Sequence, residues 1–181
     1  MNRKIIPVQK LPTIFLKPGE AHFGLDPARV ITVLGSCVSV IMYHRHTMIG
    51  AMCHAVMPSR REARRKKSLS RDIFQYVDSS MAWMLDQFDK IRIRREDIEV
   101  KIFGGSEIFN IRYDGSMSIG RKNIEAAMKT IHEQNLKLKA WNVGGNTGRK
   151  VIFNTNTGEV FTKFVTKVEQ GLAMTSSVRD R

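Results

Sequence analysis

Residues 30–58 read VITVLGSCVSVIMYHRHTMIGAMCHAVMP and carry the strongest structural signal in the chain. Val and Ile fill the first half, and Gly35–Ser36 interrupt them, which predicts two short strands joined by a tight turn or bulge. The polar segment 44–47 predicts a loop, and residues 48–56 predict a further strand that is closed by Pro58. The pattern therefore predicts a β-hairpin that is preceded by a sharp turn.

A cysteine and a histidine of this stretch come together if Tyr43 pairs with Met48. Cys37 then lies directly opposite His54, and directly opposed side chains share a face with Cβ atoms roughly 4.5–5.5 Å apart. Cys53 adjoins His54 on the same strand and so points to the other face. This geometry favours Cys37 as the partner of His54, although a register change of one residue would reverse the choice.

A thiol paired with an imidazole suits nucleophilic catalysis. A nearby imidazolium stabilises the thiolate and lowers its pKa. The turn at Gly35 and Ser36 exposes backbone N–H groups that could hold the oxyanion of a tetrahedral intermediate. The alternative interpretations are structural: Cys37 as a small buried apolar residue, and His54 as a hydrogen-bonded residue of the core or its rim.

The rest of the chain predicts an α/β fold with mostly antiparallel pairing. Apolar periodicity predicts one helix over 73–88, with Ser70 as its N-cap, and a second over 121–135 that buries Ile124, Ala127, Met128 and Ile131. Further strands are expected at 98–103 and 136–143 and in a terminal hairpin at 151–165. Four of the five prolines fall in residues 1–27, which are expected to form an extended arm over a single domain at 28–167. A polar tail at 168–181 follows.

Composition narrows the choice of partners and cofactors. The 181 residues carry a net charge of +13, which favours acidic partners such as nucleic acid, anionic lipid or an acidic protein. Two cysteines exclude a disulfide scaffold, and neither a CxxC nor an HExxH metal motif occurs. Without a signal peptide or a membrane-spanning run, the chain is expected to be cytoplasmic. The basic run 59–71 is expected to be a solvated loop; docking to an acidic surface and non-specific nucleic-acid binding are the alternatives.

Across residues 12–165 the sequence resembles the chemoreceptor glutamine deamidase family, CheD. The most specific part is LGSC at 34–37, followed by a histidine in GAMCHAVMP at 50–58. Other matching blocks lie earlier and later in the chain: LKPGEAHFGLDPARVITVLGSCVSVIMY (16–43), KIFGGSEIF (101–109), IGRKNIEAAM (119–128) and NVGGNTGRKVIFNTNTGEV (142–160).

The resemblance implies a layered α/β sandwich of two packed sheets with two main helices on one face. It implies hydrolysis of glutamine side chains on methyl-accepting chemotaxis receptors to glutamate and ammonia, with Cys37 as nucleophile, His54 as base and acid, and no metal or organic cofactor. The third family residue is a threonine. The nearest here is Thr32, five residues before Cys37, whereas some members have it six before, where this chain has Ile31. An ordinary strand residue is the alternative for Thr32.

The resemblance also implies a second function of a different class, a regulatory binding module for a CheC-type chemotaxis phosphatase. The presence of both Cys37 and His54 favours the enzyme, because an adaptor needs neither. Specific nucleic-acid binding rests on charge alone and lacks a readout motif. Insertion into a membrane is not expected.

Overall fold

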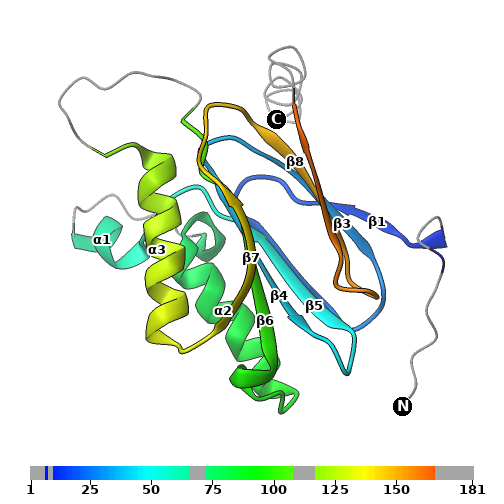
Figure 1. Ribbon diagram of the computed structural model, residues 1–181. Coiled ribbons are helices and arrows are strands. Elements are labelled where there is room, and N and C mark those ends of the chain that lie inside the picture. The colour runs from blue at the N-terminus through cyan, green and yellow to red at the C-terminus, as the bar shows by residue number, and fades with distance from the viewer. Residues whose placement is uncertain (1–6, 8–9, 66–71, 108–116, 166–181) are drawn as a thin grey trace.

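The computed structural model describes residues 7, 10–65, 72–107 and 117–165. Two β-sheets stack face to face, and two helices cover the outer side of one of them (Figure 1). This arrangement confirms the α/β layered sandwich with both main helices on one face.

In the described part of the chain, nine strands form the two sheets. The four-stranded sheet has the order β1 (Thr13–Phe15), β3 (Arg29–Leu34), β8 (Arg149–Asn154), β9 (Val160–Phe164). The five-stranded sheet has the order β2 (Glu20–Gly24), β5 (Ile49–His54), β4 (Val38–His44), β6 (Ile98–Gly104), β7 (Lys137–Val143). The pairs β1–β3 and β6–β7 are parallel and the other pairs are antiparallel, which confirms the mostly antiparallel pairing.

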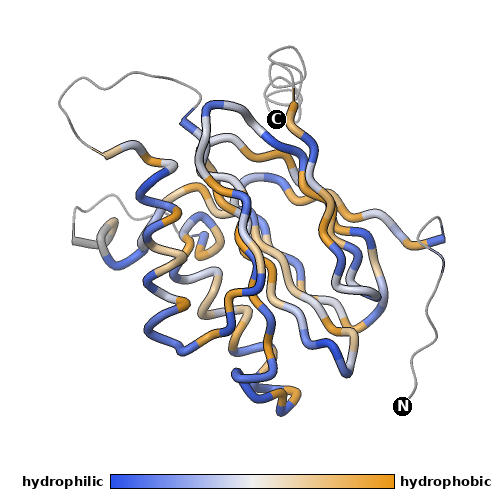
Figure 2. The backbone as a smooth tube through the Cα atoms, viewed as in Figure 1, coloured by the Kyte–Doolittle hydropathy of each residue, from blue (hydrophilic) through white to orange (hydrophobic). Residues whose placement is uncertain are grey.

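The helices differ in detail from the sequence prediction. Helix α2 (Val77–Lys90), with Tyr76 at its N-cap position, starts later than expected and follows a short 3₁₀ turn, Ile73–Gln75, whose N-cap is Asp72. The expected cap, Ser70, lies outside the described residues. Helix α3 (Ile119–Glu133) has Ser118 as its N-cap, and the Ser118 hydroxyl accepts a hydrogen bond from the N–H of Arg121. Both helices alternate hydrophilic and hydrophobic segments along their length, as a one-sided apolar face requires (Figure 2).

The prediction of a loop over residues 59–71 was wrong in part, because residues 60–65 form a short helix, α1 (Arg60–Arg65). The carboxylate of Asp78 accepts hydrogen bonds from the Arg60 N–H and the Ser59 hydroxyl, which satisfies donors at the start of this helix. Ala63 is buried. Residues 66–71 lie outside the described part of the chain.

Two apolar cores lie on opposite sides of the five-stranded sheet. One lies between this sheet and the helices, and the other fills the space between the two sheets. Strands β4 and β5 are buried along their whole length because both of their faces are covered. Alternate residues of these strands therefore belong to different cores.

The hairpin register predicted from the sequence was wrong by two residues. Tyr43 pairs with Gly50 rather than Met48, and Val38 bridges Ala55 in the same register. The loop between the strands starts one residue later than expected and closes through Met48, whose φ of 52° lies in the left-handed region. Because side chains alternate with a period of two, this shift preserves the faces. His54 therefore stays on the face expected for it.

The expected arm contributes two strands to the sheets. Strand β1 pairs with β3 at the edge of one sheet, and β2 pairs with β5 at the edge of the other. Residues 13–24 are thus built into both layers rather than only laid over them. Residues 168–181, the expected tail, lie outside the described residues. Where the chain is described, none of its helices is both long and apolar enough to cross a membrane.

Candidate active site

Cys37 lies where the chain passes from one sheet to the other. Strand β3 belongs to the four-stranded sheet and β4 to the five-stranded sheet, and Gly35, Ser36 and Cys37 connect them. The Cys37 side chain is half-buried and packs against the core between the sheets. The tight turn predicted from Gly35–Ser36 is therefore a crossing between layers, at which Cys37 is partly exposed.

His54 ends strand β5 and contacts Thr32 of the opposite sheet. Oγ1 of Thr32 lies 2.7 Å from Nδ1 of His54, and both residues are buried. The same hydroxyl donates to the carbonyl of Leu16 at 2.9 Å. The structure thus brings the side chains of Thr32 and His54 into contact.

The two contacts of Thr32 assign the tautomer of His54. A hydroxyl carries one proton, and donation of that proton to Leu16 leaves Thr32 an acceptor toward the imidazole. Nδ1 of His54 then carries the ring proton, and Nε2 keeps its lone pair. Nε2 is buried and has no hydrogen-bond partner among the described residues. A buried acceptor nitrogen without a hydrogen bond destabilises the folded state, which indicates a functional role for it. Nε2 is therefore the candidate base.

Cys37 and His54 share the face between the sheets. The position opposite Cys37 in the observed register is Val56, so His54 is offset from it by one same-face step. Diagonal neighbours of this kind lie about 7 Å apart at Cα, within the reach of a long ring side chain. The prediction that Cys37 and His54 lie directly opposite each other was wrong: they share a face as diagonal neighbours, and no hydrogen bond joins the Cys37 sulfur to the His54 ring in the described structure.

Burial favours the neutral forms of both groups. It raises the pKa of the Cys37 thiol to about 11, although the residue's own backbone N–H acts in the opposite direction. It lowers the pKa of His54 to about 4, against the opposing effect of the Leu16 carbonyl. The sequence argument expected an imidazolium that lowers the thiol pKa, whereas the structure favours a thiol beside a neutral imidazole. A thiol in this state reacts as a nucleophile only if its proton is transferred to a base.

Cys53 lies on the other face of β5. It is fully buried in the core between sheet and helices, and burial raises its pKa to about 11. Its backbone neighbour His54 points away from that core, into the layer between the sheets. The alternation therefore separates Cys53 from the imidazole, as the sequence predicted.

The three carbonyl groups of the turn, those of residues 35–37, each accept a hydrogen bond from another segment of the chain. Gly35 O accepts from the N–H of Ser106 at 2.8 Å, and Cys37 O accepts from the N–H of Gly105 at 2.8 Å. Ser36 O accepts from Nδ2 of Asn123 at 2.9 Å. In the described structure no acceptor on another residue takes the N–H of Ser36 or of Cys37. These two amides fit the role of oxyanion donors expected of the turn.

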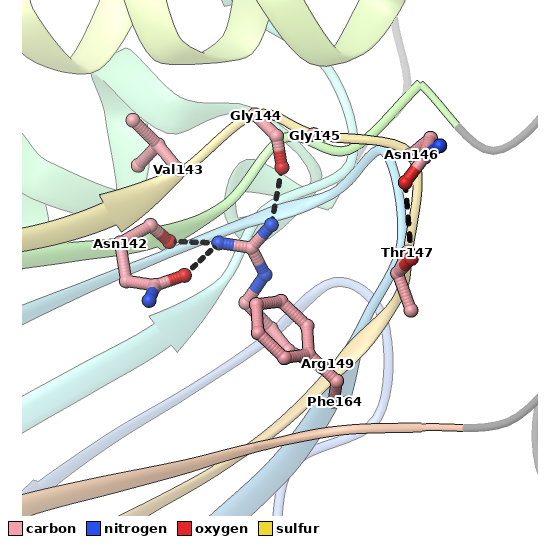
Figure 3. Close-up of a pocket in the computed structure, with 8 residues that line it drawn as sticks. All are labelled: Asn142, Val143, Gly144, Gly145, Asn146, Thr147, Arg149 and Phe164. Carbon is pink, nitrogen blue, oxygen red and sulfur yellow. Dashed lines mark hydrogen bonds between the residues drawn. The ribbon is translucent and has the colours of Figure 1, made fainter.

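A pocket of about 400 Å³ is lined by residues 142–147, by Phe164 and by Arg149, which is buried (Figure 3). Arg149 donates to the carbonyls of Asn142 and Gly144 and to Ser106 Oγ. Within the described ranges it has no carboxylate partner. Ser106 therefore links the loop that lines this pocket to the Cys37 turn.

Asn123 is the site residue that the sequence reasoning missed. The expected apolar face of α3 included Met128, but Met128 is exposed and the buried face is rotated to Gly120, Asn123, Ala127 and Ile131. A polar residue on a stripe with a spacing of four, at 123, 127 and 131, was the available signal.

Layered sheets with a contacting histidine and threonine between them, and a half-buried cysteine on the same face, define an α/β protein with a candidate thiol active site. Residues 56–164 match the sequence model of the CheD family, described as CheD chemotactic sensory transduction. This match starts just after His54, so it does not itself cover Cys37.

Curated relatives match over most of the chain. A "Probable chemoreceptor glutamine deamidase CheD 2" of Geobacter sulfurreducens is 39% identical over 88% of this chain and 94% of its own length. Similar relatives named "Probable chemoreceptor glutamine deamidase CheD" occur in Maridesulfovibrio salexigens (36% identical, 85% of this chain and 92% of that protein) and Methanococcus vannielii (32%, 80% and 90%). The chain belongs to the CheD family.

Proposed function

We propose that this protein is a glutamine deamidase of chemoreceptors that uses Cys37 as its nucleophile. The family relatives carry that name, and they align over nearly their whole length. The observation that supports the residue assignment best is the buried Nε2 of His54, which has a free lone pair and shares the inter-sheet face with Cys37.

The proposed reaction starts with a neutral pair. Sγ of Cys37 attacks the side-chain carbonyl carbon of glutamine while its proton passes to Nε2 of His54. The carbonyl oxygen becomes an oxyanion, which the N–H groups of Ser36 and Cys37 stabilise. The carbon–nitrogen bond then breaks, His54 returns its proton to the leaving nitrogen, and ammonia departs from a thioester on Cys37.

Hydrolysis of the thioester completes the cycle. Water attacks the thioester carbon as His54 Nε2 takes a proton from it, and the carbon–sulfur bond breaks. The thiolate of Cys37 recovers the proton from His54, and the product side chain is glutamate. Thr32 acts by accepting the Nδ1–H throughout, which holds the ring in the required tautomer. The steps use the side chains and water, without metal or cofactor.

The remaining parts of the proposal concern the domain and its surroundings. The proposed deamidase domain covers residues 28–167, and strands β1 and β2 of the expected arm complete its two sheets. The chemistry requires a reduced thiol, and we place it in the cytoplasm. The substrate is a receptor surface, and the net charge of +13 favours an acidic one.

Ammonia release and peptide mass spectrometry with a purified receptor fragment test this function. Each conversion of glutamine to glutamate adds about 1 Da to the receptor peptide. Cys37→Ala is expected to abolish the conversion, and Cys53→Ala to retain it. Full activity in Cys37→Ala would contradict the proposal. A role confined to binding a CheC-type phosphatase would instead survive Cys37→Ala unchanged.

A further inference from the structure

Asn123 is a fully buried polar side chain on the core face of α3. The other buried residues of that face, Gly120, Ala127 and Ile131, are small or apolar. Burial of an amide is costly unless its hydrogen bonds are made within the protein. Apolar packing of α3 therefore does not explain why an asparagine occupies this position.

The Nδ2 group of Asn123 links the two halves of the proposed site. It donates at 2.9 Å to the carbonyl of Ser36 and at 2.9 Å to the carbonyl of Val56. Ser36 directly precedes the nucleophile, and Val56 lies two residues beyond His54. Both amide protons are thus used to tie the cysteine turn to the end of the histidine strand.

The bond to Ser36 also fixes the direction of a backbone amide. The carbonyl of Ser36 and the N–H of Cys37 belong to one planar trans peptide, in which oxygen and hydrogen point in opposite directions. When Asn123 draws the Ser36 oxygen toward α3, the Cys37 N–H is turned away from α3. Ser106 N–H holds the preceding peptide through Gly35 O, so the Ser36 N–H is fixed in the same manner.

We propose that Asn123 is a positioning residue that orients the N–H of Cys37 as an oxyanion donor. This inference rests on the proposed deamidase function. Backbone amides hold the carbonyls of Gly35 and Cys37, whereas a side chain holds that of Ser36. Substitution of Asn123 therefore removes the hydrogen bond that orients the Ser36–Cys37 peptide group and leaves Ser36 and Cys37 themselves unchanged.

The other end of the amide supports a role for the donors. Oδ1 of Asn123 is buried and has no hydrogen-bond partner among the described residues. Such an unsatisfied acceptor weakens the fold. Asn123 thus satisfies two carbonyl oxygens while its own oxygen stays unpaired. We attribute its presence to the two segments that its Nδ2 group holds together, at Ser36 and Val56.

The test compares Asn123→Ala and Asn123→Asp with the unmodified protein. Neither variant can donate two hydrogen bonds, and the aspartate places a carboxylate against two carbonyl oxygens. We expect kcat for a receptor peptide to fall about 100-fold with KM changed by less than about twofold, because the donor acts in the transition state. Ile131→Val, on the same face of α3 but remote from the turn, is the matched control and is expected to retain kcat.

Two thiol reagents distinguish an effect of Asn123 on the Cys37 N–H from an effect on the reactivity of the Cys37 thiol. Iodoacetamide alkylates Cys37 by displacement at carbon and forms no oxyanion, so its rate is expected to be unchanged in the Asn123 variants. A peptide aldehyde forms a hemithioacetal with the thiol, and its affinity is expected to fall in parallel with kcat. Unchanged aldehyde affinity, or alkylation that slows in step with kcat, would overturn the inference.

A measurement on the unmodified protein covers the case in which the variants do not fold. The amide proton of Cys37, followed by NMR, is expected to shift downfield when the peptide aldehyde binds, and the absence of that shift would overturn the inference. Cys37→Ala is assayed in parallel. If it stays active, the proposed function itself fails, whereas an inactive Cys37→Ala with fully active Asn123 variants contradicts the role of Asn123 alone.

Discussion

The hydroxyl of Thr32 lies 2.7 Å from Nδ1 of His54 and joins the two sheets across the core between them. Thr32 belongs to β3 of the four-stranded sheet, and His54 ends β5 of the five-stranded sheet. The proton of that hydroxyl goes to the carbonyl of Leu16, which leaves the threonine an acceptor for the ring N–H. Packing of the two sheets thus determines which imidazole nitrogen carries the ring proton and which keeps its lone pair.

Replacement of Thr32 by valine tests this relationship. Thr32→Val keeps the shape but removes the acceptor of the Nδ1 proton, so we expect kcat to fall roughly 10- to 100-fold and stability to fall by about 1–3 kcal/mol. Thr32→Ser restores the hydroxyl and is expected to recover most of kcat. Steady-state deamidation and thermal unfolding of both variants provide the comparison. Equal activity of the valine and serine variants would show that the hydroxyl does not orient the ring.

The pH dependence of kcat/KM reports the state of His54. In the proposed mechanism His54 acts as a base in its neutral form, and burial lowers its pKa to about 4, so activity is expected to stay level as pH falls toward about 5 and to decline below that. An ordinary imidazole would be about nine-tenths protonated at roughly pH 5.5. Circular dichroism at each pH separates loss of activity from unfolding. An acid limb centred near the ordinary histidine pKa would contradict the assignment.

Gly104 supports the Cys37 turn through its backbone shape. Its φ is +103°, and a Cβ at this position would overlap the carbonyl oxygen of Cys37. Gly104→Ala is expected to cost more than about 2 kcal/mol and to reduce kcat, because the turn must move. Gly144→Ala is the matched control: its φ is +75°, yet no atom lies within 4 Å of the added carbon. We expect it to cost roughly 1 kcal/mol and to retain kcat. Similar kinetic losses in both variants would contradict this steric argument.

The two cysteines are expected to differ sharply in reactivity. Cys37 is half-buried at the crossing between sheets, whereas Cys53 has no exposed surface. Peptide mapping after brief treatment of the native protein with iodoacetamide is expected to find label on Cys37, and on Cys53 only after unfolding. Loss of activity should follow the labelling of Cys37. Early modification of Cys53, or inactivation that precedes labelling of Cys37, would be incompatible with the proposed site.

Local patterns in the sequence predict most of the strands and the face of each cysteine. Alternation in 30–58 places Cys37 and His54 on one face and Cys53 on the other, and the two-residue error in register left this assignment intact. The register itself depends on the left-handed conformation of Met48 in the loop, which a non-glycine residue does not signal.

Long-range features lie beyond such patterns. Sequence alone does not tell that β3 and β4 belong to different sheets, yet this crossing brings Thr32 to His54. The pKa values of Cys37 and His54 depend on burial between the two sheets. Burial favours a neutral thiol and a neutral imidazole, whereas the sequence pattern suggested a thiolate and an imidazolium. Asn123 was missed because its partners are carbonyls of distant segments, 87 and 67 residues away in sequence.

Detection of the proposed covalent intermediate on Cys37 is the most direct test of the proposed chemistry. Acid quenching during turnover of a receptor peptide, followed by mass spectrometry, is expected to find an adduct equal to the peptide mass less about 17 Da, since ammonia leaves as the thioester forms. Peptide mapping should place it on Cys37, and Cys37→Ala should show neither adduct nor product. An adduct on Cys53, or deamidation by Cys37→Ala, would contradict the account.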